Sequence, residues 1–211
     1  LKNMCDFKCL QESSENSSDN DDDRQQPNLG ERFAYALAEY VTRIIQVRHV
    51  SPVEREVLTS TKLHFIPKAG GNTGDTRPIG ITSSICRIAT KIILRRCTDY
   101  ACNKVRSYQL ALGRSDGCLV GASITQAYYE QGATCMFFDM KNAFNRVSRR
   151  LAYAQMLEHM PCIIPIFTLL YGKPSEAYIS KGIKLGMITT GVKQGCPLAM
   201  LAFCFAINPL L

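Results

Sequence analysis

The chain of 211 residues has no apolar stretch long enough to cross a membrane. The most apolar stretch, 196–211, falls short of the roughly 20 residues that a spanning helix needs, and Pro197 and Pro209 interrupt it at both ends. We therefore expect this stretch to form a buried core helix, and we expect no membrane partner.

Histidine is scarce, which bears on how the ten cysteines are interpreted. The three histidines (His49, His64 and His159) stand near no cysteine at the spacing of a zinc finger, which argues against structural zinc. Most cysteines lie in apolar stretches, where a free thiol behaves as a small hydrophobe. The polar and then acidic N-terminus does not resemble a signal peptide. We therefore expect a reducing, intracellular compartment.

Acidic side chains are concentrated in one short segment. Residues 11–30 contain six acids and one arginine, a net charge of −5. Since the whole chain carries +7 and residues 1–10 carry +1, residues 31–211 carry +11. A surface this basic suits a phosphate-bearing partner, although many domains are basic for solubility alone. The acidic segment is rich in Ser, Asn, Asp and Gln and has no apolar period, so we expect it to be disordered.

The order of helical and extended patterns along the chain predicts an α+β fold with a central sheet. Ser51 is expected to cap a short helix that begins at Pro52, and Ser115 to cap a later one. The expected elements are helices from 31, 52, 85 and 115, strands at 61–68 and 76–82 around a loop at 69–75, a strand at 134–139, helices at 142–159 and 161–171, a hairpin at 176–190 and a helix from 197.

The segment "CMFFDMKNAF" ends a continuous apolar run on Asp139. Such a run is typical of a central strand buried on both faces. A carboxylate at its end would be held by the sheet while the strand end opens to solvent, a position suited to a magnesium ligand. On the local pattern alone, a cap for the helix near Asn142 is the commoner role for Asp139. Phe144, taken alone, would be ordinary core packing.

Lys68 and Arg77 flank the glycine-rich loop of the first predicted hairpin. A point charge and a planar bidentate donor together suit a triphosphate, whereas a solvated hairpin with idle charges is the plainer alternative. Further along, "GVKQGCPL" opens the last helix. There Gly195 permits close backbone approach and Gln194 can hydrogen-bond a substrate or template, although a mere turn into a core helix is also possible.

Taken together and in this order, "FIPK", "RPIGIT", "DMKNAF" and "QGCPL" resemble the motifs of reverse transcriptases, most closely those of non-LTR retrotransposons. The resemblance covers about 61–211. It implies a right-hand polymerase with a mixed or antiparallel sheet packed with helices. Its fingers would lie at 61–132 and a partial palm at 133–211, after a disordered acidic segment at 1–30 and a helical extension at 31–60.

The resemblance also implies roles for single residues. Asp139 would be catalytic and would bind one side of a two-ion magnesium site. The ring of Phe144 would lie under the incoming sugar and exclude a 2′-hydroxyl. The residues implied to bind the deoxynucleoside triphosphate are Lys68, Arg77, Asn142, Ala143, Phe144, Gln194 and Gly195. The implied partners are an RNA template and a DNA primer, and the expected place of action is the nucleus.

The sequence departs from the family pattern after the last helix. The family's next motif, an aromatic-Ala-Asp-Asp hairpin, is absent, and the only adjacent aspartates are Asp21 to Asp23 in the acidic segment. One strand-borne aspartate does not fix two magnesium ions, so we expect a fragment cut at both ends and inactive by itself. The alternatives are a non-catalytic RNA-binding remnant of the same fold and an RNA-dependent RNA polymerase, which Phe144 disfavours.

Overall fold

The computed structural model describes residues 28–68, 74, 76–179 and 182–211. Most of the predicted acidic segment and of the loop at 69–75 lies outside these residues. The chain divides into two compact units, Leu1–Tyr40 and Val41–Leu211. The described part of the first unit is the largely exposed, N-terminal portion of one helix. None of the helices in the described part of the chain has the length and apolarity needed to cross a bilayer.

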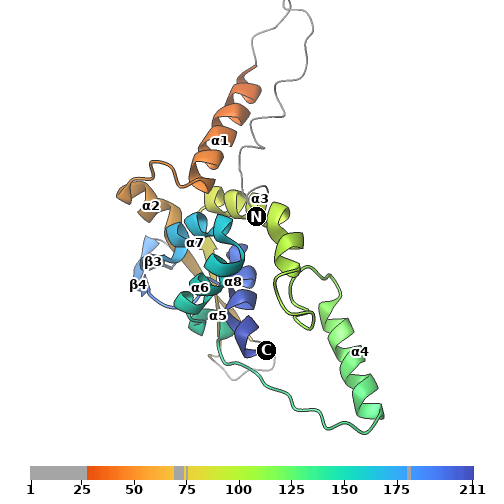
Figure 1. Cartoon of the computed structure of the whole chain (residues 1–211). Coiled ribbons are helices and arrows are strands. Elements are labelled where there is room, and N and C mark those ends of the chain that lie inside the picture. The colour runs from red at the N-terminus through yellow and green to blue at the C-terminus, as the bar shows by residue number, and fades with distance from the viewer. Residues whose placement is uncertain (1–27, 69–73, 75, 180–181) are drawn as a thin grey trace, which may run out of the picture. The chain divides into compact units, whose positions relative to one another are not determined.

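The architecture is mixed α and β, as predicted (Figure 1). The helices are α1 (Leu29–Ile45), α2 (Pro52–Thr59), α3 (Ser84–Cys102), α4 (Gly117–Glu130), α5 (Ala143–Arg146), α6 (Arg149–His159), α7 (Ile164–Tyr171) and α8 (Leu198–Ile207), with short 3-10 turns at Pro161–Ile163 and Asn208–Leu210. The strands are β1 (Thr61–Pro67), β2 (Thr76–Thr82), β3 (Ser175–Tyr178) and β4 (Lys184–Ile188).

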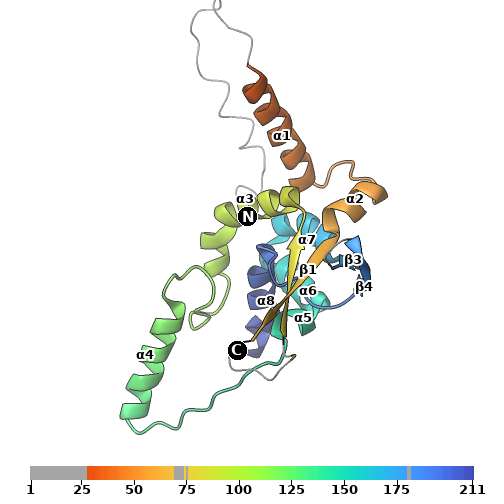
Figure 2. The ribbon, with the colours of Figure 1, turned by 180° about the vertical axis from the view of Figure 1, so that it is seen from behind.

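Four strands form one mixed sheet in the order β2-β1-β3-β4. β1 and β2 pair antiparallel from Thr61 opposite Thr82 to Pro67 opposite Thr76. β1 and β3 pair parallel, and β3 and β4 close the predicted second hairpin (Figure 2). The first hairpin and the mixed sheet are therefore confirmed.

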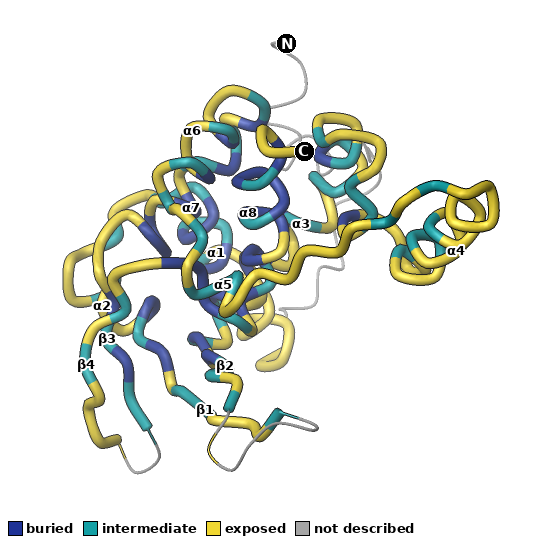
Figure 3. The backbone as a smooth tube through the Cα atoms, turned by 90° about the horizontal axis from the view of Figure 1, so that it is seen from below, coloured by how far each residue is buried: buried dark blue, intermediate teal, exposed yellow. Residues whose placement is uncertain are grey.

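The core lies around α8, whose side chains are apolar on every side, the pattern of a fully buried helix. Leu198, Leu201 and Phe205 are among its buried residues, α6 and α3 pack against it, and α7 packs in turn against α6. The buried stretches along α6, α7 and α8 appear dark blue in Figure 3. The expected core helix after Pro197 is confirmed.

The two predicted serine caps can be compared with the structure. The Ser51 hydroxyl accepts a hydrogen bond from the Glu54 N–H at 3.1 Å, so the predicted cap of α2 is confirmed. The prediction for Ser115 is wrong, because α4 begins at Gly117 and Asp116 therefore occupies the cap position, without a side-chain hydrogen bond.

The predicted buried strand at 134–139 is wrong. The segment is neither helix nor strand, and Met136, Phe137 and Phe138 are 73%, 80% and 86% exposed. A strand is stable only with paired neighbours, and none of the four described strands pairs with this segment. Figure 3 shows the stretch between α4 and α5 exposed along most of its length. An apolar run alone therefore does not decide burial.

The predicted single helix at 142–159 is wrong in its continuity. α5 ends at Arg146, the backbone of Val147 is extended, and α6 begins at Arg149. The Ser148 hydroxyl accepts a hydrogen bond from the Leu151 N–H at 3.2 Å and so caps a new helix. A serine cap inside an apolar period separates the two helices.

Candidate functional site

A cavity of about 220 Å³ lies where the β1–β2 hairpin meets the loop that leads into α8. It is lined by Leu63, Pro78 and Gly80 of the hairpin, by Asn145 of α5, and by Met187, Ile188, Thr189, Thr190, Val192, Lys193 and Gln194. Three segments far apart in the sequence, each singled out by its motif, therefore meet around one space.

The turn at Gln194 and Gly195 is bonded to the outer edge of β2. The Gly80 N–H donates a hydrogen bond to the Gln194 carbonyl at 2.6 Å. Gly195 has φ +114°, and a Cβ atom there would lie 2.7 Å from the Gly80 carbonyl oxygen. Only glycine fits this conformation and this gap. The predicted close approach at Gly195 is thus made to β2, and its contact with a nucleotide stays a prediction.

α5 is held against the same loop. The Phe144 carbonyl accepts a hydrogen bond from the Val192 N–H at 2.7 Å, and a Cβ atom on Gly191 would lie 2.2 Å from the Asn145 carbonyl. The Phe144 ring is half-buried and packs against Phe203 of α8, with ring centroids 5.1 Å apart. This contact fixes the position of Phe144, whose role at the sugar stays a prediction.

Lys193, which sequence reasoning did not select, is buried inside this loop at 3% exposure. Its Nζ donates a hydrogen bond to the Thr59 carbonyl at 2.6 Å and so ties the loop to the end of α2. The pKa of Lys193 is lowered to about 8, mainly by burial and also by the neighbouring charge of Arg149. The lysine stands between apolar and polar neighbours in "GVKQG", and no periodicity signals its burial.

Arg149, at the start of α6, is the second cation that sequence reasoning missed. Its Nε donates to the Gly191 carbonyl at 2.6 Å, and its Nη atoms donate to the carbonyls of Tyr171, Ile188 and Thr190 at 3.3–3.4 Å. The guanidinium also lies over the Tyr171 ring, 5.4 Å from its centroid, and burial lowers the pKa of Arg149. One side chain therefore holds the strand end and the loop that precede Gln194.

Asp139 lies outside this packed region. It is exposed, does not line the cavity, and is not a helix cap. Asn142, at φ +56° and exposed, takes the cap position of α5 without a side-chain hydrogen bond, and Ala143 begins the helix. Their backbone contact with a triphosphate stays a prediction.

The fit of a magnesium ion rests on Asp139. Its carboxylate is of the type that magnesium prefers, but the ion needs further oxygen ligands. Within the described residues there is no group of three or more His, Cys, Asp or Glu side chains that could hold a metal ion. These residues therefore do not complete a two-ion site.

Lys68 and Arg77 lie at the loop end of the hairpin. Arg77 is exposed and pairs with Ile66, and Lys68, half-buried, stands two residues beyond Ile66. Because side chains alternate along a strand, Arg77 lies on one face of the hairpin, while Pro78 and Gly80, which line the cavity, belong to the opposite face. Both cations lie near the loop end of the hairpin, and their binding of a triphosphate stays a prediction.

Comparison with known families agrees with the motifs. A model described as reverse transcriptase (RNA-dependent DNA polymerase) matches residues 66–211. No curated protein matches the chain. The matched region begins within β1 and includes the remaining hairpin, Asp139, α5 and the loop before α8. Because it covers more than half of the sequence, the chain belongs to the reverse transcriptase family of RNA-directed DNA polymerases.

Proposed function

We propose that this polypeptide takes part in template-directed deoxynucleotidyl transfer of the non-LTR retrotransposon type, with an RNA template and a DNA primer. What supports the proposal is the bond between Gly80 and the Gln194 carbonyl, which joins the hairpin and the Gln-Gly turn around one cavity. In this proposal 61–132 acts as the fingers and 133–211 as part of the palm, preceded by a helical extension at 31–60. The place of action is intracellular and nuclear.

In this proposal the chain's residues position an incoming deoxynucleotide. Lys68 and Arg77 bind its triphosphate from the hairpin, and the N–H groups of Asn142 and Ala143 bind it from α5. Gln194 and Gly195 contact the base or sugar. Asp139 supplies one carboxylate to a magnesium site that gains its other ligands from nucleotide phosphates, water or further carboxylates.

Primer extension on an RNA template tests the proposal. We expect no incorporation by the 211-residue chain, because Asp139 lies on an unpaired segment and the described residues complete no metal site. A longer polypeptide of the same gene that carries an Asp-Asp motif should incorporate deoxynucleotides with magnesium. In that polypeptide, Arg77→Ala should raise the KM for deoxynucleotide. A well-folded longer polypeptide without any incorporation would overturn the proposal.

The sugar gate is tested in the same polypeptide. Phe144→Ala should admit ribonucleotides, because the ring that would meet the 2′-hydroxyl is removed. Phe203→Leu is the matched control, since it disrupts the same ring pair while leaving Phe144 in place. Equal sugar selectivity in the Phe144→Ala variant and the parent polypeptide would remove the assignment.

A second candidate, passive RNA binding, is favoured by the outer face of α3. Arg87, Lys91 and Arg95 repeat at four-residue spacing and are exposed. In the described part of the chain none of them forms an ion pair with an acidic side chain. Ile88 and Ile92, at 39% and 38% exposure, lie between them. Such a face can hold a phosphate backbone without Asp139 being in place.

The salt dependence of RNA binding tests this second candidate. Changing Arg87, Lys91 and Arg95 together to Gln should reduce the slope of log K against log salt by about 2 for single-stranded RNA. The matched control removes the same charge from exposed positions on other elements, Arg48→Gln, Lys62→Gln and Arg150→Gln. Equal slopes for the two triple variants would exclude α3 as the RNA-binding face.

A further inference from the structure

The loop before α8 contacts the backbone of α5 at three consecutive residues. The Thr190 hydroxyl donates a hydrogen bond to the Asn145 carbonyl at 3.4 Å. The Val192 N–H donates one to the Phe144 carbonyl at 2.7 Å. Between them Gly191, at φ +65°, lies so close that a Cβ atom would be 2.2 Å from the Asn145 carbonyl oxygen. The loop therefore sets the position of the α5 backbone, including that of Phe144.

This loop depends on Arg149 for its own position. Residues 189–196 belong to no helix or strand, so contacts with other elements must hold their backbone groups. Arg149 Nε donates a hydrogen bond to the Gly191 carbonyl at 2.6 Å, and Nη2 donates one to the Thr190 carbonyl at 3.4 Å. These are two of the three loop residues that contact α5. One side chain therefore binds the part of the loop that places Phe144.

The guanidinium of Arg149 is in turn held by α7 and β4. Its Nη1 donates a hydrogen bond to the Tyr171 carbonyl at 3.3 Å, and its Nη2 also donates to the Ile188 carbonyl at 3.4 Å. Its Cζ lies 5.4 Å from the centroid of the Tyr171 ring. A planar fork of donors that also lies over an aromatic ring is particular to arginine. A lysine keeps the charge on a flexible stem without the fork, so Arg149→Lys should loosen the loop.

A small shift of the loop is enough to matter at Phe144. Its ring packs against Phe203, with centroids 5.1 Å apart, and its carbonyl is bonded to Val192. Exclusion of a 2′-hydroxyl is a steric contact, which depends on where the ring lies. A displacement of about 1 Å, caused by a change far from the reacting atoms, can alter a rate by about a hundred-fold.

We propose that Arg149 is a positioning residue for sugar selection. It holds the loop against α5, and the loop holds Phe144 where the ring meets the 2′ position of an incoming nucleotide. The guanidinium is turned toward backbone carbonyls, so it acts through Phe144 and not by contact with the nucleotide. This inference rests on the proposed function, since it takes Phe144 as the residue that contacts the sugar.

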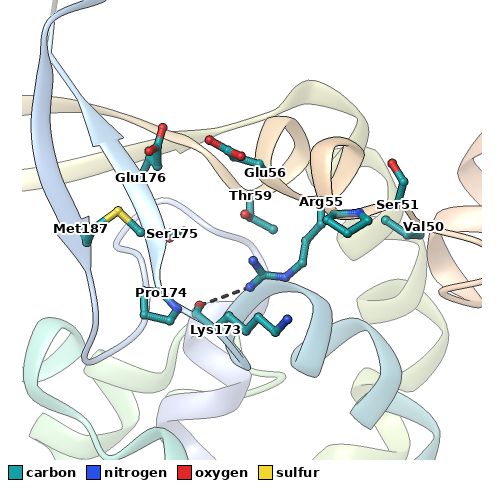
Figure 4. A pocket seen from close by; sticks show the side chains of 11 residues that line it. Val50, Ser51, Arg55, Glu56, Thr59, Lys173, Pro174, Ser175, Glu176 and Met187 are labelled. Atoms are coloured by element: carbon teal, nitrogen blue, oxygen red, sulfur yellow. Dashed lines mark hydrogen bonds between the residues drawn. The ribbon is translucent and has the colours of Figure 1, made fainter.

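Arg55 of α2 supplies a matched control. It is also half-buried, and its guanidinium also donates to a backbone carbonyl, from Nη2 to Lys173 at 3.2 Å (Figure 4). Within the described residues no hydrogen bond joins Arg55 to the loop before α8. Arg55→Lys therefore removes a contact of the same kind and leaves the loop untouched.

Amide hydrogen exchange on the 211-residue chain tests the positioning step without nucleotide. In Arg149→Lys, protection of the Val192 N–H should fall at least about ten-fold relative to the amides of α8, which report the stability of the core. In Arg55→Lys this ratio should stay unaltered. A ratio equally unaltered in Arg149→Lys would overturn the inference, because the loop would then hold Phe144 without the arginine.

The sugar selectivity of the longer polypeptide tests the consequence. The readout is the kcat/KM for a deoxynucleotide divided by that for the matching ribonucleotide, a ratio that an equal loss of both rates does not move. Arg149→Lys should lower the ratio at least about five-fold, and Arg55→Lys should not change it. Added to Phe144→Ala, Arg149→Lys should lower the ratio no further, because an absent ring has no position to set.

The outcomes separate this inference from the proposed function. A well-folded parent polypeptide without any incorporation would overturn both. A parent that incorporates deoxynucleotides, with equal sugar selectivity in its Arg149→Lys variant, would overturn the role of Arg149 alone.

Discussion

Two segments with strong sequence motifs have opposite surroundings in the structure. The loop at 189–196 is bonded on three sides, through Gln194 to Gly80, through Val192 to Phe144, and through Lys193 to Thr59. The segment at 135–142 pairs with no described strand, and its apolar side chains face outward. Among the described residues, the first segment is hydrogen-bonded to three other elements, whereas the second forms hydrogen bonds at its ends, Cys135 and Asn142. Partners, more than hydrophobicity, decide which motif is fixed in place.

The difference bears on function. The packed loop and the hairpin are already fixed against each other by hydrogen bonds, while Asp139, the carboxylate proposed to bind magnesium, lies on the exposed segment. Preorganisation is what lets charged groups act on a substrate. The expected inactivity of the 211-residue chain follows from this unequal order.

The largest expected effect on stability comes from Arg149, which holds the packed loop at 189–196. Arg149→Met keeps an apolar stem over Tyr171 but removes the hydrogen bonds to four carbonyls. We expect the free energy of unfolding to fall by about 3 kcal/mol, since several part-buried carbonyls lose a charged donor together. Urea denaturation measures it. Arg150→Met, exposed on the next position, is the control, and equal losses in both variants would refute the role of Arg149.

The next effect tests the contact between the turn and β2. Gly195→Ala places a methyl group 2.7 Å from the Gly80 carbonyl at a φ unfavourable for alanine. We expect a loss of about 2 kcal/mol or more in the free energy of unfolding. Gly182→Ala is the control, because Gly182 also has a positive φ, of +73°, but open space around it. A similar loss at both positions would show that φ strain alone matters.

A smaller effect is the pH dependence that Lys193 gives to stability. Burial lowers the pKa of Lys193 from 10.5 to about 8, so above pH 8 the folded chain has released a proton that the unfolded chain still binds. This lysine therefore adds stability as the pH rises from 8 toward 10.5. Burial raises the pKa of Cys86 to about 12 and that of Cys204 to about 11, from an ordinary 9.0. Above pH 9 the unfolded chain releases these protons more readily than the folded chain, so the two thiols lower the stability of the fold as the pH rises.

Comparison with Lys193→Met isolates the lysine, because the thiols are common to both proteins. The stability of the wild type relative to Lys193→Met should rise by about 1 kcal/mol between pH 8 and pH 9. Denaturation at several pH values measures it. A difference that stays constant with pH would show that Lys193 has an ordinary pKa.

The smallest effect on stability is expected in the exposed segment at 135–142. Phe137→Ala and Phe138→Ala should each change the free energy of unfolding by less than about 0.5 kcal/mol, since both rings are already in solvent. Phe205→Ala, in the core of α8, is the opposite control and should cost about 3–5 kcal/mol. A loss above 1 kcal/mol at Phe137 or Phe138 would show that this segment is packed after all.

Local patterns predicted much of the fold. The hairpin at 61–82, the cap at Ser51 and the core helix after Pro197 depend on neighbours in the sequence, and the structure has all three. The Gln-Gly turn of the candidate site could also be predicted, because a turn depends on residues that are adjacent in the sequence.

The rest depends on contacts that no local pattern encodes. Lys193 and Arg149 act through backbone carbonyls of residues distant in the sequence, and a carbonyl has no residue-specific signature. The strand expected before Asp139 failed because pairing requires a neighbouring strand, which an apolar run does not specify.

Amide hydrogen exchange on the 211-residue chain tests most directly whether the two segments differ in order. The N–H groups of Gly80 and Val192, both hydrogen-bonded between segments, should exchange only on wide opening of the fold. Those of Phe137 and Phe138 should exchange at nearly the rate of an unstructured chain. Equal protection of the two pairs would contradict the unequal order proposed for the site.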